Sequence, residues 1–361
     1  MIGVREDLAE LEGYHSAQVT VDVRLNTNES PYPPPPAWRE AFLEELATVP
    51  FNRYPDRSAT ALREVIGELH GVGPEQVLAA NGSNEILQAL CLAYGGAGRT
   101  VAVFEPTYAL HSHIPRITGT GVVVGERRDD FTLDPAEVTR VLGEAQPAIA
   151  FLCSPNNPTG RIDPAEVVEA ALDAAPGLVV VDEAYGQFTP TSALPLVSDD
   201  RPLVVTRTFS KTWSMAACRL GYCVAPAGIV AAAERAVLPY HLGAATQIAG
   251  RLALRFTAEM EARVAALVAE RERLAAALSD LPVETWPSGA NFLLFRPRHA
   301  DRTQGPSGPL SGAAVWKALV ERSVLVRDCS SWPRLDGCLR VTVGTPAEDD
   351  AFLAALKEVL S

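Results

Sequence analysis

Between residues 76 and 225 the chain alternates short apolar runs with stretches of helical spacing, and this alternation constrains its fold most strongly. The apolar runs are QVLAA (76–80), TVAVFE (100–105), GVVVG (121–125), AIAFLC (148–153), LVVVDE (178–183), LVVTRT (203–208) and LGYCVA (220–225). Runs without polar residues at alternate positions are typical of strands buried on both faces. Because helical patterns such as NEILQALCLAYG separate these runs, the sequence predicts an α/β fold with a mostly parallel seven-stranded sheet covered by helices.

A smaller C-terminal α/β domain is predicted after this region. The Ala-, Glu- and Arg-rich stretch 244–281 has the pattern of one or two long helices, and VETWP, NFLLFRP, SVLVRD and CLRVTV then follow as short strands. The proline cluster PYPPPPAW (31–38) has the stiffness of an extended arm. We therefore divide the chain into an N-terminal arm with part of the small domain (1–45), a large domain (46–240) and a small domain (241–361).

The charge balance and the cysteines exclude several classes of function. Lys and Arg number 31 against 44 Asp and Glu, a net charge of −13, so general affinity for nucleic acid or anionic lipid is not expected. No run approaches the roughly 18 apolar residues of a membrane helix, and the first residues lack the apolar core of a signal peptide, so we expect a cytoplasmic protein. The six cysteines have no zinc spacing. His111 and His113 would share a face if they lay on a strand, but no third ligand is near, and no metal is expected.

Polar residues follow the first and fourth strands of the predicted large sheet, where ligands bind in such folds. After QVLAA, Gly82, Ser83 and Asn84 open a helix, and this arrangement suits a phosphate cradle, although helix capping by Ser83 or Asn84 would explain it alone. After AIAFLC, the string SPNNPTG fixes the backbone with two prolines, so that Asn157 can point at a ligand. An ordinary Asn-Pro turn is the alternative.

The next two strands end in an acid and in a lysine. Asp182 closes a buried strand, where a carboxylate needs a partner, and Tyr185 follows it. Lys211 lies in FSKTW with Arg219 eight residues later, and a buried lysine can serve as a nucleophilic amine. A solvated surface lysine is the alternative. Together the four strand ends match the needs of pyridoxal 5′-phosphate, which combines a phosphate, an aldehyde for a lysine and a ring nitrogen that pairs with an acid.

The same strings resemble those of the fold type I pyridoxal-phosphate aminotransferases, and within them the histidinol-phosphate aminotransferase subfamily. The matching segments are LNTNESPYP (25–33), NRYPD (52–56), AANGSNE (79–85), FEPTY (104–108), SPNNPTG (154–160), VVVDEAY (179–185), TRTFSK (206–211), RLGY (219–222), LPYHL (238–242), ANFLLF (290–295), VLVRD (324–328) and LRVTVGT (339–345). They run in the family's order through nearly the whole chain.

The resemblance implies a role for each matching residue. Lys211 bonds to the cofactor and shuttles the proton, Asp182 pairs with the ring nitrogen, and Tyr108 stacks on the ring. Contacts to the phenolic oxygen are implied for Asn157 and Tyr185. The phosphate would be held by Gly82, Ser83, Asn84, Thr208, Ser210 and Arg219, with Tyr54 reaching it from the other subunit of a homodimer. The substrate site would be lined by Tyr14, Asn28, Asn291, Arg327 and Arg340.

The implied activity is amino transfer between histidinol phosphate, as amino donor, and 2-oxoglutarate, as the 2-oxo acid acceptor. Two departures from the family pattern concern the substrate: bulky Trp213 and Met215 after the lysine, which either pack or narrow the pocket, and the long connection 328–338 between the two arginines. Three alternatives follow. The chain could use another aromatic or specialised substrate, run lyase or oxidase chemistry, or serve as a ligand sensor without catalysis.

Overall fold

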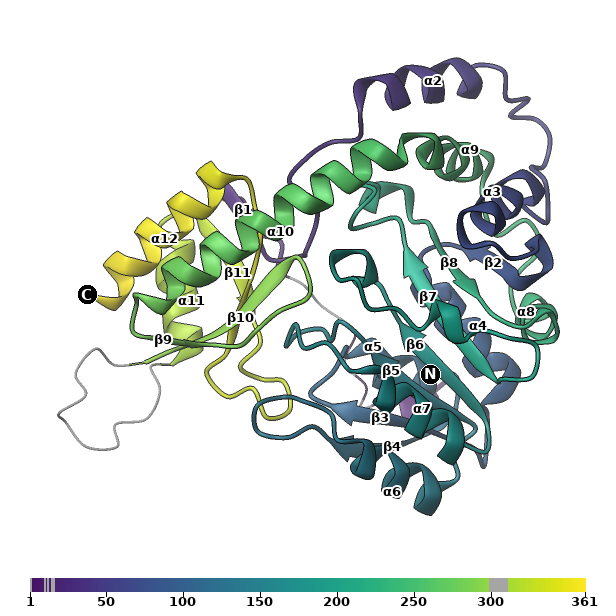
Figure 1. Ribbon diagram of the computed structural model, residues 1–361, viewed down its shortest axis with the longest axis horizontal. Coiled ribbons are helices and arrows are strands. Elements are labelled where there is room, and N and C mark those ends of the chain that lie inside the picture. Colours follow the sequence, from purple (N-terminus) through teal and green to yellow (C-terminus); the bar gives the residue numbers. More distant parts are fainter. Residues whose placement is uncertain (1, 10, 12, 14–16, 299–310) are drawn as a thin grey trace.

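The computed structural model describes residues 2–9, 11, 13, 17–298 and 311–361 and arranges them around two sheets (Figure 1). The larger sheet has seven strands in the order β2-β8-β7-β6-β5-β3-β4. These are β2 (Val77–Ala80), β3 (Thr100–Glu105), β4 (Gly121–Glu126), β5 (Ile149–Cys153), β6 (Leu178–Asp182), β7 (Leu203–Thr208) and β8 (Gly221–Val224). Only β8 runs against its neighbours. The predicted mostly parallel sheet is confirmed, and each of the seven apolar runs supplies a strand.

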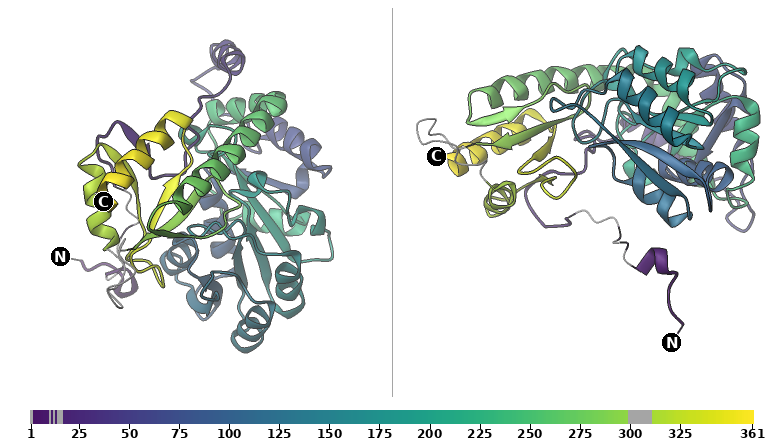
Figure 2. Two further views of the ribbon diagram at one scale, coloured as in Figure 1. Left: turned by 60° about the vertical axis from the view of Figure 1, so that its left-hand side comes forward. Right: turned by 90° about the horizontal axis from the view of Figure 1, so that it is seen from below.

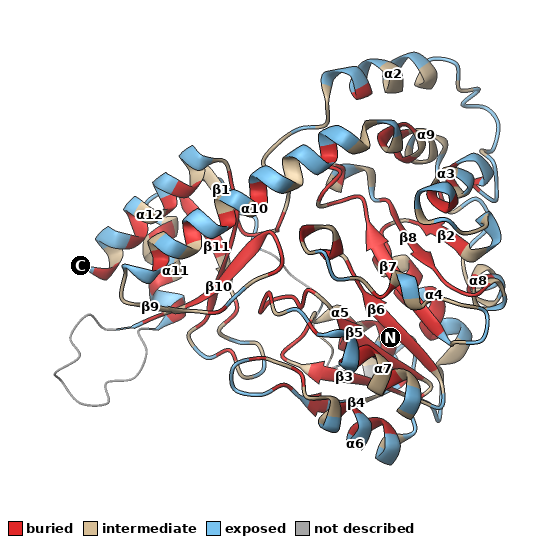
Figure 3. Cartoon of the chain, in the orientation of Figure 1, coloured by how far each residue is buried: buried red, intermediate tan, exposed pale blue. Residues whose placement is uncertain are grey.

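Successive residues of the central strands are buried on opposite faces of this sheet, which explains their uniformly apolar sequence. Ile149 and Phe151 pack with helices α4 and α8, whereas Ala150 and Leu152 pack with α6 and α7. Figure 3 shows the central strands as buried and the outer sides of the helices as exposed. The covering helices are α4 (Ser83–Tyr94), α5 (Leu110–Ile117), α6 (Pro135–Ala145), α7 (Ala165–Ala174) and α8 (Ala227–Glu234).

A third apolar cluster covers the β2–β8 edge of the sheet. Trp38 of α2 donates its indole N–H to the carbonyl oxygen of Ala249 at 3.1 Å, which fixes α2 on α9. Leu62 and Ile66 of α3 belong to the same cluster. The helices and 3₁₀ turns of these and neighbouring segments are α1 (Glu6–Ala9), α2 (Pro36–Leu46), α3 (Thr60–His70), α9 (Ala244–Ala253), η1 (Pro74–Gln76), η2 (Gly186–Phe188), η3 (Leu194–Leu196), η4 (Ala216–Cys218) and η5 (Leu254–Phe256).

The smaller sheet has five strands in the order β1-β11-β12-β10-β9. Its strands are β1 (Val23–Leu25), β9 (Val283–Thr285), β10 (Phe292–Pro297), β11 (Val324–Asp328) and β12 (Leu339–Thr342), and its helices are α10 (Thr257–Ser279), α11 (Gly312–Val320) and α12 (Pro346–Leu360). Strand β1 pairs with β11 in parallel, so a segment near the N-terminus completes a sheet made by the C-terminal third. The predicted C-terminal strands are all present.

Helix α10 runs from the side of the larger sheet to the smaller one (Figures 1 and 2). Its C-terminal residues Leu274 and Leu278 lie in the core of the smaller sheet, and Met260 near its start lies in the cluster with α2, α3 and α9. The domain limits at 45 and 240 stay a prediction. Among the described residues, no helix combines the length and the apolar character that crossing a membrane requires.

Candidate active site

A cavity of about 390 Å³ lies where the carboxyl ends of the parallel strands face the smaller sheet. The structure brings most of the predicted site residues to its walls. They are Asn28, Gly82, Ser83, Asn84, Tyr108, Asn157, Asp182, Tyr185, Thr208, Ser210, Lys211, Arg219, Arg327 and Arg340. These residues come from segments more than 300 positions apart in the chain, so only the packing of the two sheets unites them.

Lys211 follows β7 after two residues, and its amine reaches into the cavity. Its Nζ donates a hydrogen bond to the carbonyl oxygen of Thr27 at 2.9 Å and lies 5.9 Å from the centre of the Tyr185 ring. Burial lowers the pKa of Lys211 to about 7, assisted by the positive charges of Arg340 and Arg219 and opposed by Glu29. A large fraction of the amine is therefore neutral and nucleophilic near neutral pH.

Asp182, the last residue of β6, is held by three hydrogen-bonding groups at the floor of the cavity. Its Oδ2 lies 3.0 Å from Nε2 of His111, and its Oδ1 accepts from the backbone N–H of Ala184 at 3.0 Å and the Thr206 hydroxyl at 3.2 Å. Asp182 is 1% exposed. The buried carboxylate thus has the partners that its position demands.

His111 is a residue of the site that the sequence analysis did not identify. His111 and His113 lie on helix α5 and not on a strand, so the condition under which they would share a face is not met. His111 is fully buried and its ring stacks on Phe151 with centroids 5.0 Å apart. The sequence feature that could have indicated a buried His111 is its helical spacing from Ile114, which places both side chains on one buried face of α5. Within the described residues no cluster of His, Cys, Asp or Glu could hold a metal.

Small and hydroxyl side chains form a cradle for an anion around the start of α4. Gly82 precedes Ser83, the first residue of the helix, and no side chain caps this helix, so the capping alternative does not account for Ser83 or Asn84. Ser210 accepts from Arg219 at 3.5 Å and from the Thr208 hydroxyl at 3.1 Å. Free helix N–H groups, hydroxyls and a guanidinium together suit a phosphate.

Gly82 allows the closest approach in this cradle. Its φ is +78°, and a Cβ built there would lie 2.9 Å from Nη2 of Arg219. A larger residue would therefore push the guanidinium away and strain the backbone.

Amide and guanidinium groups also line the cavity. Arg340 donates from Nη1 to Oδ1 of Asn157 and from Nη2 to the carbonyl oxygen of Asn26 at 2.9 Å. Asn28 donates from Nδ2 to the Tyr185 hydroxyl at 2.8 Å. Burial raises the pKa of Tyr185, so its hydroxyl keeps its proton and can donate to a ligand oxygen.

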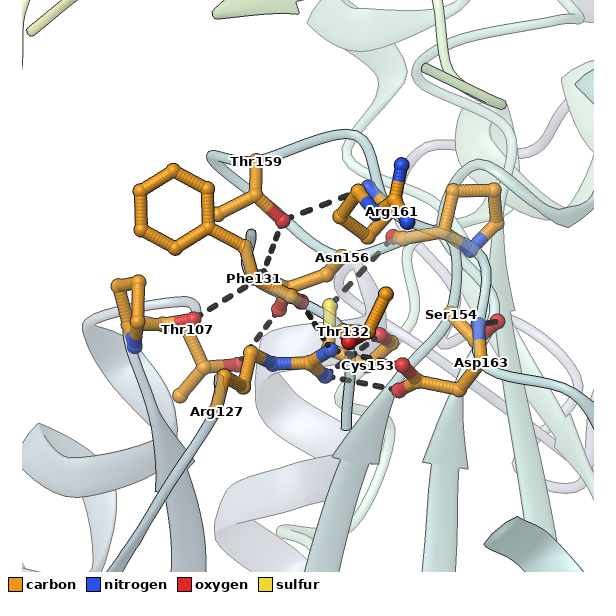
Figure 4. Close-up of polar contacts among 12 residues, drawn as sticks. Thr107, Arg127, Phe131, Thr132, Cys153, Ser154, Asn156, Thr159, Arg161 and Asp163 are labelled. Atoms are coloured by element: carbon orange, nitrogen blue, oxygen red, sulfur yellow. Dashed lines mark hydrogen bonds and ion pairs between the residues drawn. The ribbon is translucent and has the colours of Figure 1, made fainter. Parts of the chain in front are cut away.

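The loop that carries Asn157 is fixed by a buried polar network (Figure 4). Asn156 donates to the carbonyl oxygen of Pro106 at 2.9 Å and to the Thr159 hydroxyl at 2.8 Å. Arg127 and Asp163 form a two-pronged ion pair, with both N–O distances 2.7 Å. Both residues are almost completely buried, so the pair is shielded from solvent and holds the end of the loop rigidly.

Two of the predicted residues that the structure describes, Asn291 and Tyr54, do not line the cavity. Asn291 supports it from behind, since its Nδ2 donates to the carbonyl oxygen of Asn28 at 3.2 Å. Tyr54 is 80% exposed and stacks on Tyr240 with ring centroids 4.5 Å apart. Tyr14 lies outside the described residues.

The two bulky residues after the lysine do not narrow the pocket. Trp213 and Met215 are buried in the apolar cluster under α3 and α9. The cavity is lined instead by Ala216 and Ala217. The packing interpretation of these two residues therefore holds.

Comparison with known proteins identifies the family of this chain. Residues 20–356 match the family model of the class I and II aminotransferases. The chain is 44% identical to a histidinol-phosphate aminotransferase of Frankia casuarinae over 99% of this chain and 90% of the relative, and 44% identical to one of Thermobifida fusca over 98% and 94%. The structure of a Sinorhizobium meliloti histidinol-phosphate aminotransferase, in complex with pyridoxal-5′-phosphate, superposes with a TM-score of 0.83 at 23% identity, covering 94% of this chain and 91% of that one.

The chain belongs to the class I and II aminotransferases, which are pyridoxal-phosphate enzymes of fold type I. The resemblance inferred from the motifs is confirmed, and so are the fold class, the enzyme class and the cofactor.

Proposed function

We propose that the chain transfers the amino group of histidinol phosphate to 2-oxoglutarate with pyridoxal phosphate as cofactor. The observation that carries this proposal is the pair of guanidinium groups, Arg327 and Arg340, on the wall of the cavity that holds Lys211. Guanidinium groups bind phosphate and carboxylate through paired hydrogen bonds. The relatives named histidinol-phosphate aminotransferase support the same substrate.

The described residues fit the cofactor at each of its polar groups. The cradle of Gly82, Ser83, Asn84, Thr208, Ser210 and Arg219 would hold the phosphate, and Tyr108 would stack on the ring. Tyr185 would donate to the phenolic oxygen, and Asn157 would lie beside it. When bound, pyridoxal phosphate supplies an electron sink that stabilises negative charge at the substrate's α-carbon.

Asp182 and Lys211 would perform the proton chemistry. Asp182 would keep a proton on the ring nitrogen, and the hydrogen bonds from Thr206 and Ala184 keep its carboxylate pointed in one direction. Lys211 would accept the proton from the substrate's α-carbon at Nζ and return it to the cofactor side. Its lowered pKa suits both steps, because a neutral amine accepts a proton and its conjugate acid gives it back near neutral pH.

Both substrates would share one anion pocket. Histidinol phosphate has a phosphate and no α-carboxylate, whereas glutamate has carboxylates only. Arg327 and Arg340 would bind either group, because both anions present two oxygens to a guanidinium. This arrangement explains how a protein with a net charge of −13 attracts anionic substrates.

We infer a homodimer with shared active sites. Tyr54 would reach the cofactor phosphate of the partner, and its position supports this role because it is exposed and stacks on the exposed Tyr240. Phe51 and Leu238, close to these two residues in the sequence, are exposed as well. Exposed apolar patches of this kind mark protein interfaces.

We also propose a cytoplasmic location. The six cysteines are free thiols, as in proteins of a reducing compartment.

A substrate panel tests the proposal. Cofactor-loaded protein is given histidinol phosphate, histidinol and phenylalanine with 2-oxoglutarate, and glutamate formation is measured. We expect histidinol phosphate to react with the highest kcat/KM and histidinol to react poorly. If phenylalanine is preferred, another aromatic aminotransferase activity replaces the proposal; if carbon dioxide or ammonia is released instead, the chemistry is that of a lyase or an oxidase. Binding without any reaction would indicate a sensor.

A further inference from the structure

The connection 329–338 between β11 and β12 is a rigid platform beside the substrate cavity. Backbone hydrogen bonds fold it into consecutive turns, from Trp332 N–H to the Cys329 oxygen at 2.9 Å, from Leu335 to Trp332 at 3.1 Å and from Cys338 to Leu335 at 2.8 Å. Cys329, Leu335 and Cys338 are completely buried. They pack in an apolar cluster with Phe131 of the larger domain, so the connection is anchored to both halves of the molecule.

Arg334 secures the outer part of this platform. It donates from Nη1 to the carbonyl oxygen of Arg127 and from Nη2 to Oδ1 of Asp129 at 3.0 Å. Arg334 has a φ of 62°, a left-handed conformation that a residue with a side chain keeps only where its surroundings hold it. The platform is therefore fixed to the same buried network that holds the loop of Asn157 (Figure 4).

The ring of Trp332 lies against the guanidinium group of Arg327, a residue that lines the cavity. The Arg327 Cζ lies 5.5 Å from the centre of the Trp332 ring, within the range of a cation–π interaction. Arg327 lines the cavity, whereas Trp332 is not among the residues that line it. A ring stacked against a guanidinium restricts the directions in which the N–H groups of that guanidinium can point.

We propose that Trp332 is a positioning residue for the anion pocket, which holds Arg327 so that its guanidinium faces a dianionic substrate group. The inference rests on the proposed function in naming a phosphate as that group. It assigns a purpose to the long connection between the arginines, because this connection carries the ring that lies against Arg327.

The chain contains a matched control for this interaction. Trp286 has the same relationship to Arg296, whose Cζ lies 5.3 Å from its ring, and Trp286 packs in the same apolar cluster. Arg296 does not line the cavity. Trp286→Leu therefore removes a comparable stack and a comparable core residue without affecting the anion pocket.

The experiment measures anion affinity and turnover separately. Inorganic phosphate is titrated into cofactor-loaded protein by calorimetry, and KM and kcat for histidinol phosphate are measured on the same preparations. Trp332→Leu should weaken phosphate binding and raise KM by about 5- to 30-fold, with kcat within about twofold of wild type, because Lys211 and Asp182 are untouched. Trp332→Phe should recover most of the affinity, and Trp286→Leu should leave both quantities unchanged. Arg327→Gln should abolish the titrated phosphate site.

Several results would overturn the proposal. Equal effects of Trp332→Leu and Trp286→Leu, a loss confined to kcat, or full phosphate affinity in Arg327→Gln each contradict it. If Trp332→Leu does not fold, as judged by its melting temperature, Trp332→Phe and Trp332→Tyr decide. A phosphate affinity close to that of wild type in both supports the positioning role of an aromatic ring, and a loss in both of about 5- to 30-fold, as expected for leucine, contradicts it. If wild type fails to turn over histidinol phosphate while phosphate affinity still depends on Trp332, the substrate assignment falls and the positioning role stands.

Discussion

Arg327 of β11 and Arg340 of β12 are direct cross-strand partners, and both side chains line the same cavity. Two like charges opposite each other on a sheet are unfavourable unless an anion or other acceptors compensate them. Asn157 and the carbonyl oxygen of Asn26 compensate Arg340 in part. The pair therefore has the character of a preorganised receptor, whose repulsion a bound phosphate or carboxylate would relieve.

Arg340→Ala should lower kcat/KM by about 10- to 100-fold in both half-reactions, because a charge-assisted hydrogen bond contributes on the order of 1.5–3 kcal/mol. Arg340→Lys should recover only part of this loss, since an ammonium cannot form a two-pronged contact. Each half-reaction is measured by single-turnover absorbance changes with histidinol phosphate and with glutamate. A loss with one substrate only would show that the two anions use different sites.

The negative charge of Glu29 should set the pH range in which Lys211 is reactive. Glu29 raises the pKa of Lys211, which burial has lowered to about 7, so Glu29→Gln should lower this pKa further. The rate at which cofactor-free protein captures pyridoxal phosphate should rise with pH up to about 7 in wild type, because only the neutral amine attacks the aldehyde. In Glu29→Gln the midpoint should move to lower pH by up to about one unit.

The control for this titration is Glu126→Gln, an exposed carboxylate on β4 outside the cavity. Glu126→Gln should leave the midpoint of the pH dependence of pyridoxal phosphate capture unchanged. An upward shift in Glu29→Gln would contradict the electrostatic role of Glu29.

Tyr54→Ala and Lys211→Ala should complement each other if the active site is shared between subunits. Lys211→Ala should be inactive, and Tyr54→Ala should be weak in cofactor binding. Refolding the two together gives heterodimers in which one site carries both native residues, so activity should return to about a quarter of wild type at most. Mass spectrometry verifies the heterodimers, and their presence without activity would contradict the cross-subunit role of Tyr54.

Asp349 should make the protein less stable as pH rises. Burial, assisted by the negative charge of Glu270, raises the pKa of Asp349 to about 8 in the folded state, against an ordinary 3.8. The folded state therefore holds this proton more tightly than the unfolded state, and stability falls between pH 4 and pH 8. Asp349→Asn keeps the oxygen that accepts from the Gly344 N–H and removes the charge.

Relative to wild type, Asp349→Asn should gain about 1–3 kcal/mol in its free energy of unfolding at pH 9 and less at pH 5. Urea titrations at the two values measure this difference. Glu358→Gln, an exposed position on the same helix that pairs with Arg322, is the control and should show no such trend. A gain that is equal at both pH values would exclude titration of Asp349 as the cause.

Local patterns in the sequence were sufficient to predict most of the larger sheet. Its central strands are buried on both faces, and that burial requires the uninterrupted apolar runs that were recognised in LVVVDE and LVVTRT. The residues directly after these strands were predicted as a site because parallel strands bring their carboxyl ends to one edge. Lys211 and Asp182 were found in this way, and the motifs gave the family.

Other parts of the site depended on contacts that no local pattern records. His111 binds Asp182 across 71 positions, and its neighbours in sequence did not distinguish it from a core histidine. Asn28 and Thr342 meet across 314 positions because β1 joins the C-terminal sheet. Whether Trp213 and Met215 narrowed the pocket depended on which way their side chains point, and the packing against α3 and α9 decided it.

The sequence by itself determined the secondary structure of the larger sheet, the family and the chemistry of the strand ends, because these depend on short-range periodicity and on residue types. Only the tertiary structure decided which distant groups compensate each buried charge, from His111 at Asp182 to Asn157 at Arg340. The physical reason is that a charge removed from water needs partners within a few ångströms in space, and folding can take those partners from any point in the chain.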